Sequence, residues 1–260
     1  MIRDTDFINT LYIAQRSKTL YVKGGFGLLL NKKNKERCIN AYDYNKKRAS
    51  KINAMPSDSF GFDCCGLVKG CAGGFYGDTK KTYGGAIYNT DHTLGEDHDV
   101  PDVNEKGLIE RCINVTKCRK IKNPDIPAGA LLWMTGHCGV YLGDNIVIES
   151  TPSGSDRVQL TQYDDKNWMK WGLLPFVSYN IVPDNKKLVL AKPTLRIGSK
   201  GFQVYYLQED LNHLGEDLET DGQFGPLTLA AVKRFQKNHN LVVDGIYGPK
   251  SYNAMMEALR

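Results

Sequence analysis

The sequence predicts an α+β protein with two domains, the first of mixed helices and strands and the second of three helices. Apolar side chains recur at helical spacing near the N-terminus, which indicates a helix there. Residues 127–150 alternate as strands do around a Gly-Asp-Asn turn. The last seventy residues repeat a turn followed by a helical pattern. A chain of 260 residues also exceeds the usual size of one domain.

The N-terminal segment is expected to form a short amphipathic helix. Its apolar residues run from Phe7 to Ala14, after Asp4 and Thr5, which are good helix caps. Charged side chains interrupt the first twenty residues, so the segment does not resemble a signal peptide. No apolar run approaches the roughly 20 residues that a membrane span needs. We therefore expect no insertion into a membrane.

Charge and cysteine content limit the classes of partner. The formal net charge is +5, and residues 192–260 hold eight basic and eight acidic side chains, so the excess belongs to the first 191 residues. A mildly basic domain suits an acidic polymer such as a cell wall or a nucleic acid. The charges are not clustered with aromatics, so no nucleic-acid partner is expected. The seven cysteines are odd in number and irregularly spaced, which predicts at least one free thiol rather than a disulfide framework.

One cysteine stands where a helix is expected to begin. In the segment 62–70, Asp63 is a plausible N-cap, and Cys64 then lies in the first helical turn. Free backbone N–H groups at a helix start stabilise a thiolate, and so does a nearby imidazolium. Cys64 is therefore a candidate nucleophile, although the segment alone is also compatible with a buried structural cysteine.

Residues 127–150 are expected to form one strand and then a hairpin that turns around Gly143-Asp144-Asn145. Alternation places His137 on one face and Cys138 with the apolar set on the other, as a small core residue. If the pairing is symmetric about Gly143, Glu149 lies directly opposite His137 and can hold its imidazole, whereas a different turn closure puts Glu149 on the wrong side. The alternative for Glu149 is a solvated strand residue.

The chain changes character near residue 180. A polar stretch, 180–187, indicates a linker, and we expect domains at 1–180 and 193–260 joined by residues 181–192. In the second domain, the pattern Asp-Gly-x-aromatic-Gly-Pro-x-hydroxyl begins at Asp221 and again at Asp244. Asp-Gly makes a tight turn and Gly-Pro starts a new helix.

The second domain resembles the three-helix peptidoglycan-binding domain of many wall hydrolases. The resemblance rests on 195–201, Leu207-Gln208, 221–228, 231–236 and 243–249. It implies bacterial peptidoglycan as the partner of the chain.

The first domain resembles the NlpC-type cell-wall peptidases, which have a compact papain-like fold with N-terminal helices packed on an antiparallel sheet. The resemblance rests on 62–68, 137–143 and the segment that begins at Tyr21. It implies Cys64 as nucleophile, His137 as general base and Glu149 as the residue that orients the imidazole.

The same resemblance places Tyr21, Asp63 and Cys65 at the substrate or the oxyanion. Cys65 stands where the family usually has Ser, which leaves open which thiol reacts, and Glu149 stands where the family commonly has His. The acid of the family's Pro-Gly-Asp is lost in Ala128-Gly129-Ala130.

Two long segments, 26–61 and 70–123, exceed what a minimal member of this family needs. They contain His92, His98, Cys112 and Cys118, whose spacing matches no common zinc pattern. We interpret them as specificity loops and expect neither a metal nor a cofactor.

The resemblances together imply a hydrolase of the wall stem peptide, with γ-D-glutamyl endopeptidase as the first expectation. A CHAP-type N-acetylmuramoyl-L-alanine amidase, an acyltransferase on the same fold and a non-catalytic wall binder are the alternatives. A lytic domain and a wall anchor without a signal peptide resemble a phage endolysin, made in the cytoplasm and acting at the wall after release. We expect a monomer.

Overall fold

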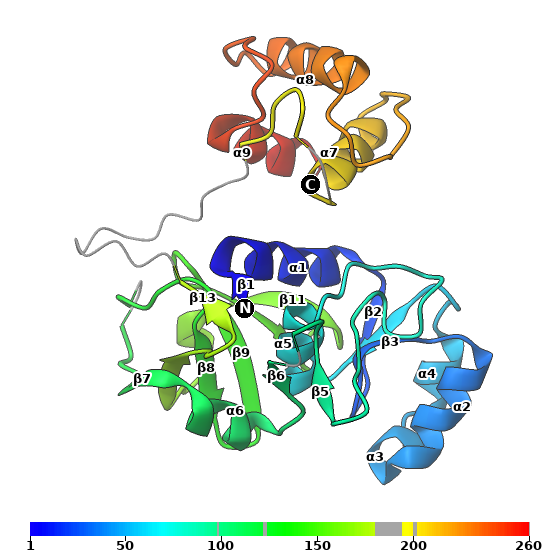
Figure 1. The fold of residues 1–260 in the computed structure, drawn as a ribbon, viewed down its shortest axis with the longest axis vertical. Helices are drawn as coiled ribbons and strands as arrows, with labels where there is room; N and C mark the ends of the chain where they lie inside the picture. The colour runs from blue at the N-terminus through cyan, green and yellow to red at the C-terminus, as the bar shows by residue number, and fades with distance from the viewer. Residues whose placement is uncertain (98, 122–123, 180–193, 200–201, 260) are drawn as a thin grey trace. The chain divides into compact units, whose positions relative to one another are not determined.

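The structure is a computed structural model that describes residues 1–97, 99–121, 124–179, 194–199 and 202–259. The chain forms two compact units, Met1–Leu190 and Ala191–Arg260. Both are drawn in Figure 1. The predicted linker at 181–192 lies outside the described residues, as does His98.

Unit 1 is built around a six-stranded antiparallel sheet with the strand order β11-β10-β9-β8-β12-β7. Its strands are β7 (Ile113–Lys117), β8 (Leu131–Met134), β9 (His137–Gly143), β10 (Ile146–Ser150), β11 (Val158–Gln162) and β12 (Lys170–Leu173). The inner strands carry apolar residues on both faces, because both Tyr141 and Leu142 are buried. The predicted α+β class is therefore confirmed for the described residues.

Smaller elements complete unit 1. A three-stranded sheet has the order β2-β4-β3, with β2 at Thr19–Tyr21, β3 at Phe26–Leu29 and β4 at Phe60–Phe62. Two short pairs join β1 (Ile2–Arg3) with β13 (Val177–Ser178) and β5 (Thr93–Leu94) with β6 (Val100–Pro101). A 3-10 helix, η1, spans Tyr163–Asp165, and α6 spans Glu105–Arg111.

The predicted N-terminal helix is present as α1 (Asp4–Arg16), with Phe7, Leu11 and Ala14 buried. Its N-cap is Arg3 rather than Asp4 or Thr5, so the predicted cap was one residue late. The acids of its first turn, Asp4 and Asp6, still suit the positive end of the helix dipole.

Helix α5 (Cys64–Ala72) lies between the two sheets and packs against α1, β3 and β9 (Figure 1). Glycine at two positions makes this approach possible. A Cβ on Gly66 would overlap the carbonyl oxygen of Gly25, and one on Gly70 would overlap that of Phe26. The backbone before and within β3 thus rests directly on the helix, which fixes where its first turn lies.

The strand predicted across 127–143 is two strands. Thr135 and Gly136 form a tight turn between β8 and β9, with Gly136 at φ +78°, and Met134 pairs with His137. The second turn is the predicted one, with Asp144 and Asn145 both at positive φ. Such two-residue turns with left-handed backbone match the twist of paired strands.

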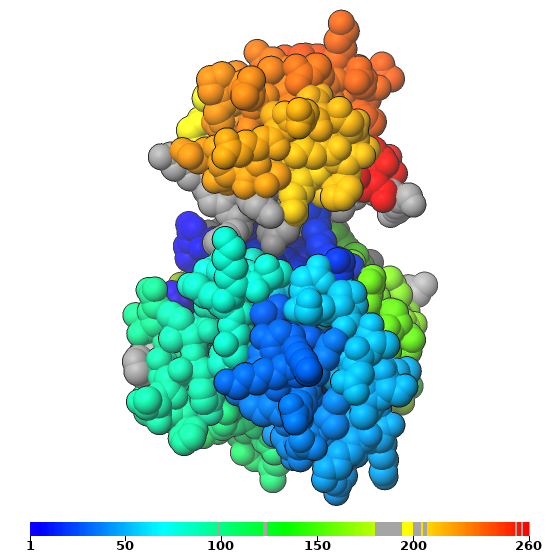
Figure 2. All heavy atoms as spheres, turned by 90° about the vertical axis from the view of Figure 1, so that its right-hand side faces the viewer, coloured from blue at the N-terminus to red at the C-terminus, as the bar shows by residue number. Residues whose placement is uncertain are grey.

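Between β3 and β4, the first long insert contains three helices, α2 (Lys32–Ala41), α3 (Asp43–Lys46) and α4 (Ala49–Ala54). Figure 2 shows the side of unit 1 on which residues of this blue-to-cyan segment are exposed. Arg48 joins the insert to the rest of the unit, because its Nη2 donates to both carboxylate oxygens of Asp156.

Unit 2 contains the three predicted helices, α7 (Phe202–His213), α8 (Pro226–Asn238) and α9 (Pro249–Ala258). Proline opens both α8 and α9, as the repeat predicts. Its core includes Leu207, Phe224, Val232 and Tyr247.

The repeat also contains a buried polar hub that the sequence analysis did not recognise. Gln236 is 1% exposed; its amide nitrogen donates to Asp244, Ser251 and the Ile246 carbonyl, and its oxygen accepts from Gly245 N–H. Gln208 makes the same set of contacts in the first copy, with Asp221, Gln223, Thr228 and Gly222. Each turn is thus held to the preceding helix by one glutamine.

Among the described residues, the helices are too short or too polar to cross a bilayer.

Candidate active site

A groove with a cavity volume of about 560 Å³ opens on unit 1 along α5. Tyr21, Asp63, Cys64 and Cys65 all line it, so four of the six predicted site residues share one surface. The rest of its lining comes from the segment 23–26, Tyr42, Tyr44, Gly66, Lys69, the segment 102–105 and Gly136. Both long inserts therefore contribute to the groove, the first through Tyr42 and Tyr44 and the second through 102–105.

Asp63 caps α5 as predicted. Its carboxylate accepts the Gly66 N–H at 2.6 Å and the Gly24 N–H at 2.7 Å. Burial and the neighbouring Cys64 charge raise the pKa of Asp63 to about 6, against the opposing effect of these two N–H groups. The cap holds the first turn of the helix and the Tyr21–Gly25 segment together.

Cys64 lies in that first turn with 7% of its surface exposed. Hydrogen bonds from Cys138 and Cys65 lower the pKa of the Cys64 thiol strongly, and the neighbouring His137 lowers it further through a hydrogen bond and its charge. Burial opposes this shift. Cys64 and His137 are thus close enough to shift each other's pKa, and the lowered pKa of Cys64 favours the thiolate.

His137 begins β9, directly after the turn at Gly136. Burial alone would lower its pKa, but hydrogen bonds to Cys64 and Glu149, together with their negative charges, outweigh this and raise the pKa to about 9. The imidazole also stacks on Trp168, with ring centroids 5.7 Å apart. At neutral pH these shifts favour a thiolate–imidazolium pair.

Glu149 is hydrogen-bonded to His137 Nε2, although the two residues are not paired directly opposite each other in the sheet. Val147 pairs with Tyr141 and Ile148 with Val140, so Glu149 lies next to Gly139, two residues from the predicted partner. The turn closed by Gly143 and Ile146 would by itself place Glu149 opposite Val140, on the wrong face, and the bulge between Ile146 and Val147 shifts the register back by one residue, so Glu149 stays on the predicted face. A Cβ at Gly139 would lie 3.3 Å from Glu149 Cβ, so the absence of a side chain there leaves room for the diagonal contact.

The Glu149 side chain is fully buried, which contradicts the alternative of a solvated strand residue. Thr161 Oγ1 donates to Glu149 Oε1 at 2.7 Å, and Lys166 forms an ion pair with the same oxygen. Burial would raise the pKa of Glu149, but the hydrogen bonds from His137, Lys166 and Thr161 lower it below its usual value. Glu149 is thus held as a carboxylate under the imidazole.

Tyr21 lies at the end of β2, on the wall of the groove, with its ring edge-on to Tyr44 at 5.9 Å. Arg48 stacks over the same ring, 5.7 Å from its centroid. Burial and the negative charges of Cys64 and Asp63 raise the pKa of the Tyr21 hydroxyl, so it stays protonated and can donate.

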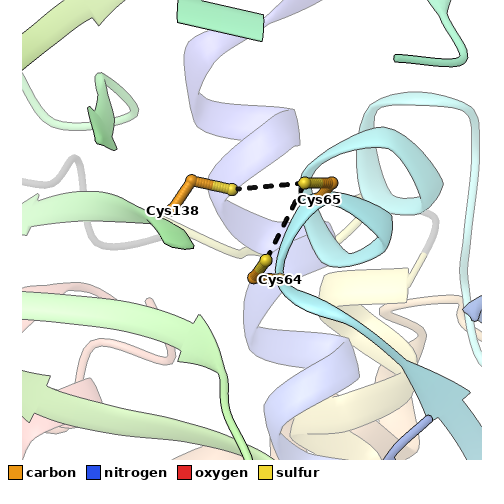
Figure 3. A group of neighbouring side chains, drawn as sticks. All are labelled: Cys64, Cys65 and Cys138. Carbon is orange, nitrogen blue, oxygen red and sulfur yellow. Dashed lines mark hydrogen bonds between the residues drawn. The ribbon is translucent and has the colours of Figure 1, made fainter. Parts of the chain in front are cut away.

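Cys138 is fully buried, as expected for a core residue, but it is also part of the site. Its Sγ lies 3.9 Å from that of Cys65, which lies 3.8 Å from that of Cys64 (Figure 3). The thiols of Cys65 and Cys138 both keep raised pKa values, since the proximity of the Cys64 thiolate disfavours a second negative charge. All seven cysteines are free.

The insert residues considered for a metal do not come together in the described structure. His92 Nδ1 contacts the Tyr88 hydroxyl, which donates to Asp102 at the groove. Cys112 packs against Gly172, and Cys118 packs at the edge of a core cluster around Tyr163.

Sequence reasoning missed Thr161, Lys166 and the contact of Trp168 with His137. They belong to β11 and the segment after it, which reach the site only through the pairing of β11 with β10. A register for this pairing could have placed Thr161 near Glu149.

Comparison with known proteins identifies the C-terminal unit. Residues 200–255 match the family model described as "Putative peptidoglycan binding domain". This match confirms the predicted peptidoglycan-binding domain.

Individual relatives match over about a quarter of the chain. The zinc D-Ala-D-Ala carboxypeptidase of Streptomyces albus G is 45% identical over 67 residues, which are 25% of this chain and 26% of that protein. The crystal structure of the Burkholderia AP3 phage endolysin is 43% identical over 26% of each chain, with a TM-score of 0.25. A fused Zn-dependent amidase/peptidase/peptidoglycan-binding domain-containing protein from Clostridium acetobutylicum is 36% identical over 25% of this chain and 29% of its own, with a TM-score of 0.24. The chain thus spans about a quarter of the length of the curated relative that it matches. The C-terminal unit contains a peptidoglycan-binding domain.

Proposed function

We propose that unit 1 is a peptidoglycan hydrolase of the papain-like NlpC type, which cleaves an amide bond of the wall stem peptide by Cys–His catalysis. One arrangement supports this proposal above all. Cys64 stands at the start of α5 near enough to His137 for the imidazole to lower its pKa, His137 is hydrogen-bonded to the buried Glu149, and Cys64 lines a groove. Amide hydrolysis by a thiol requires a nucleophile, a base next to it and a carboxylate that orients the base, and these three residues supply them in that order.

In the proposed reaction, the Cys64 thiolate attacks the carbonyl carbon of the scissile amide. The negative charge that develops on the oxygen is stabilised by the Cys64 N–H at the helix start, with the Tyr21 hydroxyl as a second donor. His137 gives its proton to the leaving amine, which departs and leaves a thioester on Cys64. His137 then takes a proton from water, whose attack on the thioester releases the acid and restores the Cys64 thiolate beside the His137 imidazolium.

Glu149 acts through His137 rather than on the substrate. Its carboxylate fixes the orientation of the imidazole through Nε2 and stabilises the imidazolium form. Lys166 and Thr161 hold that carboxylate from the far side. One face of β9 thus carries both His137, the base, and Gly139, which leaves room for the Glu149 side chain.

The bond that we propose first is the γ-D-glutamyl linkage, cleaved by an endopeptidase. The alternative is the amide between muramic acid and L-Ala, cleaved by an amidase with the same Cys and His. Mass spectrometry of digested sacculi separates them, because the amidase releases a free stem N-terminus at L-Ala. Clearing of a wall suspension decides against a non-catalytic binder or an acyltransferase.

The nucleophile itself is tested by a matched pair of variants. Cys64→Ala should abolish wall lysis without unfolding unit 1, as followed by circular dichroism, whereas Cys65→Ala should retain measurable lysis. Lysis that survives Cys64→Ala and is lost in Cys65→Ala would move the nucleophile by one residue.

Unit 2, which we propose to be joined to residues 1–180 by a linker at 181–192, would hold the hydrolase at its polymer. Tethering raises the effective concentration of scissile bonds around the groove without any new contact in the catalytic unit. We propose that the protein acts at the wall in the manner of an endolysin, as a monomer. One of its relatives carries that name.

A further inference from the structure

Three sulfur atoms meet at the start of α5. Cys64 and Cys65 come from the first turn of the helix, and Cys138 reaches them from the second residue of β9 (Figure 3). The Sγ atom of Cys65 lies 3.8 Å from that of Cys64 and 3.9 Å from that of Cys138, and all three atoms lie within 4.8 Å of one another. No backbone rearrangement is needed to bring them together.

These separations agree with those of a thiolate metal site. Sulfur ligands at about 2.3 Å from a cation are about 3.8 Å apart in a tetrahedral arrangement and about 4.0 Å apart in a trigonal plane. We propose that Cys64, Cys65 and Cys138 form a binding site for a single soft, thiophilic cation of the Zn²⁺ or Cu⁺ class. The donor set accounts for the class, because thiolates select such cations over hard ions such as Mg²⁺ and Ca²⁺.

The surroundings allow entry and charge balance. Cys64 and Cys65 both line the groove, so an ion and a fourth ligand such as water reach the sulfur atoms from that side. Cys138 is fully buried and forms the floor of the site. The helix N-terminus stabilises negative charge at the first two sulfurs. Each thiol that becomes a ligand releases its proton to the solvent, and no oxidation or reduction takes place.

Binding of the cation has a consequence that rests on the proposed function. A metal-bound Cys64 sulfur is unavailable for attack on a carbonyl carbon, so the loaded protein is an inactive form that a chelator converts back to the active one. The site would thus make wall lysis sensitive to free thiophilic metal.

The experiment uses the full-length reduced protein and Cd²⁺ as the probe, because Cd²⁺–thiolate bonds absorb in the ultraviolet. Titration should show one tightly bound ion with the absorbance of three thiolates. Cys65→Ser and Cys138→Ser should each weaken the affinity by at least the ~10–100-fold typical of losing even a supporting residue of a metal site. Cys118→Ser, which removes a half-buried thiol outside the trio, should leave the titration unchanged.

Thermal unfolding of each variant keeps the test decisive. Cys138 is buried and its replacement can disturb packing, so the more accessible Cys65→Ser carries the result if Cys138→Ser does not fold. Absorbance of fewer than three thiolates per ion, or tight binding that persists in Cys65→Ser, would overturn the proposal.

A parallel assay separates this proposal from the proposed function. One equivalent of Cd²⁺ or Zn²⁺ should stop the clearing of a wall suspension, and EDTA should restore it. Three-thiolate binding in a protein that does not clear walls would support the metal site and contradict the hydrolase. Clearing that is unaffected by an ion bound with three thiolates would contradict Cys64 as a ligand.

Discussion

Glu149→Gln is the perturbation that examines the site most closely. The substitution keeps the volume of a fully buried side chain and removes only its charge. Glu149 contacts His137 directly, and its charge is one of the causes that raise the pKa of His137 to about 9. An opposite charge within about 4–6 Å shifts a pKa by about 1–3 units. We therefore expect the pKa of His137 to fall to about 6–8 in the variant.

The consequence for activity follows from the protonation of His137. Because the imidazolium gives its proton to the leaving amine, activity should fall as pH rises through the pKa of His137. A shift of two units, from about 9 to about 7, reduces the protonated fraction at pH 8 roughly tenfold. The alkaline limb of kcat/KM on a soluble muropeptide should move down by the same amount, and the NMR titration of the His137 ring should move with it.

Stability has its own pH dependence, which the same experiment must follow. The folded pKa of His137, about 9, lies above its unfolded value of 6.5. Its contribution to the free energy of unfolding is therefore fully present below pH 6.5 and is lost as pH rises through about 9. Glu149→Gln also leaves Lys166 without its partner, and breaking a buried pair costs about 3–5 kcal/mol, so folding is checked by thermal unfolding.

Glu36→Gln, a charge change at an exposed position of α2, is the matched control. It should alter neither the alkaline limb of kcat/KM nor the free energy of unfolding. An alkaline limb and a His137 titration that stay in place in a folded Glu149→Gln protein would refute the reasoning.

Three further predictions concern the rest of the molecule. Gln236→Leu leaves the buried Gly245 N–H without its acceptor, at about 1–3 kcal/mol, and removes one of the two hydrogen bonds that the exposed Asp244 carboxylate accepts; sedimentation with sacculi should fall, and unchanged unfolding of unit 2 would show that the hub is dispensable. Deleting 191–260 should slow lysis of whole walls far more than cleavage of a soluble muropeptide, and equal losses would assign that unit a role in folding instead. Gly66→Ala places a methyl group against the Gly25 carbonyl, so unit 1 should lose about 1–3 kcal/mol or more, measured by urea unfolding; an unaltered midpoint would contradict the close approach of the Gly25 backbone to α5.

Much of the site could be predicted because it depends on local sequence. The cap by Asp63 and the helix that starts at Cys64 follow from adjacent residues, and the structure contains both. The turn at Asp144 and Asn145 follows from residues that accept positive φ. In the C-terminal unit, Gly-Pro before α8 and α9 indicated both helix starts.

What could not be predicted depends on pairing between distant segments. Whether Glu149 reaches His137 depends on a bulge at Ile146, which no local pattern reveals. The break at Gly136 was missed because alternation continues through it, so β8 and β9 read as one strand. Cys138 was assigned to the core correctly, but its contact with Cys65 requires knowing which helix covers that face of the sheet.

The most direct measurement is to trap the covalent intermediate. The protein is mixed with a soluble muropeptide, quenched in acid within milliseconds to seconds, digested and mapped by mass spectrometry. We expect a thioester adduct of the acyl half of the substrate on Cys64, and a slower turnover of that adduct in Glu149→Gln. An adduct on Cys65, or substrate cleavage that continues in Cys64→Ala, would contradict it.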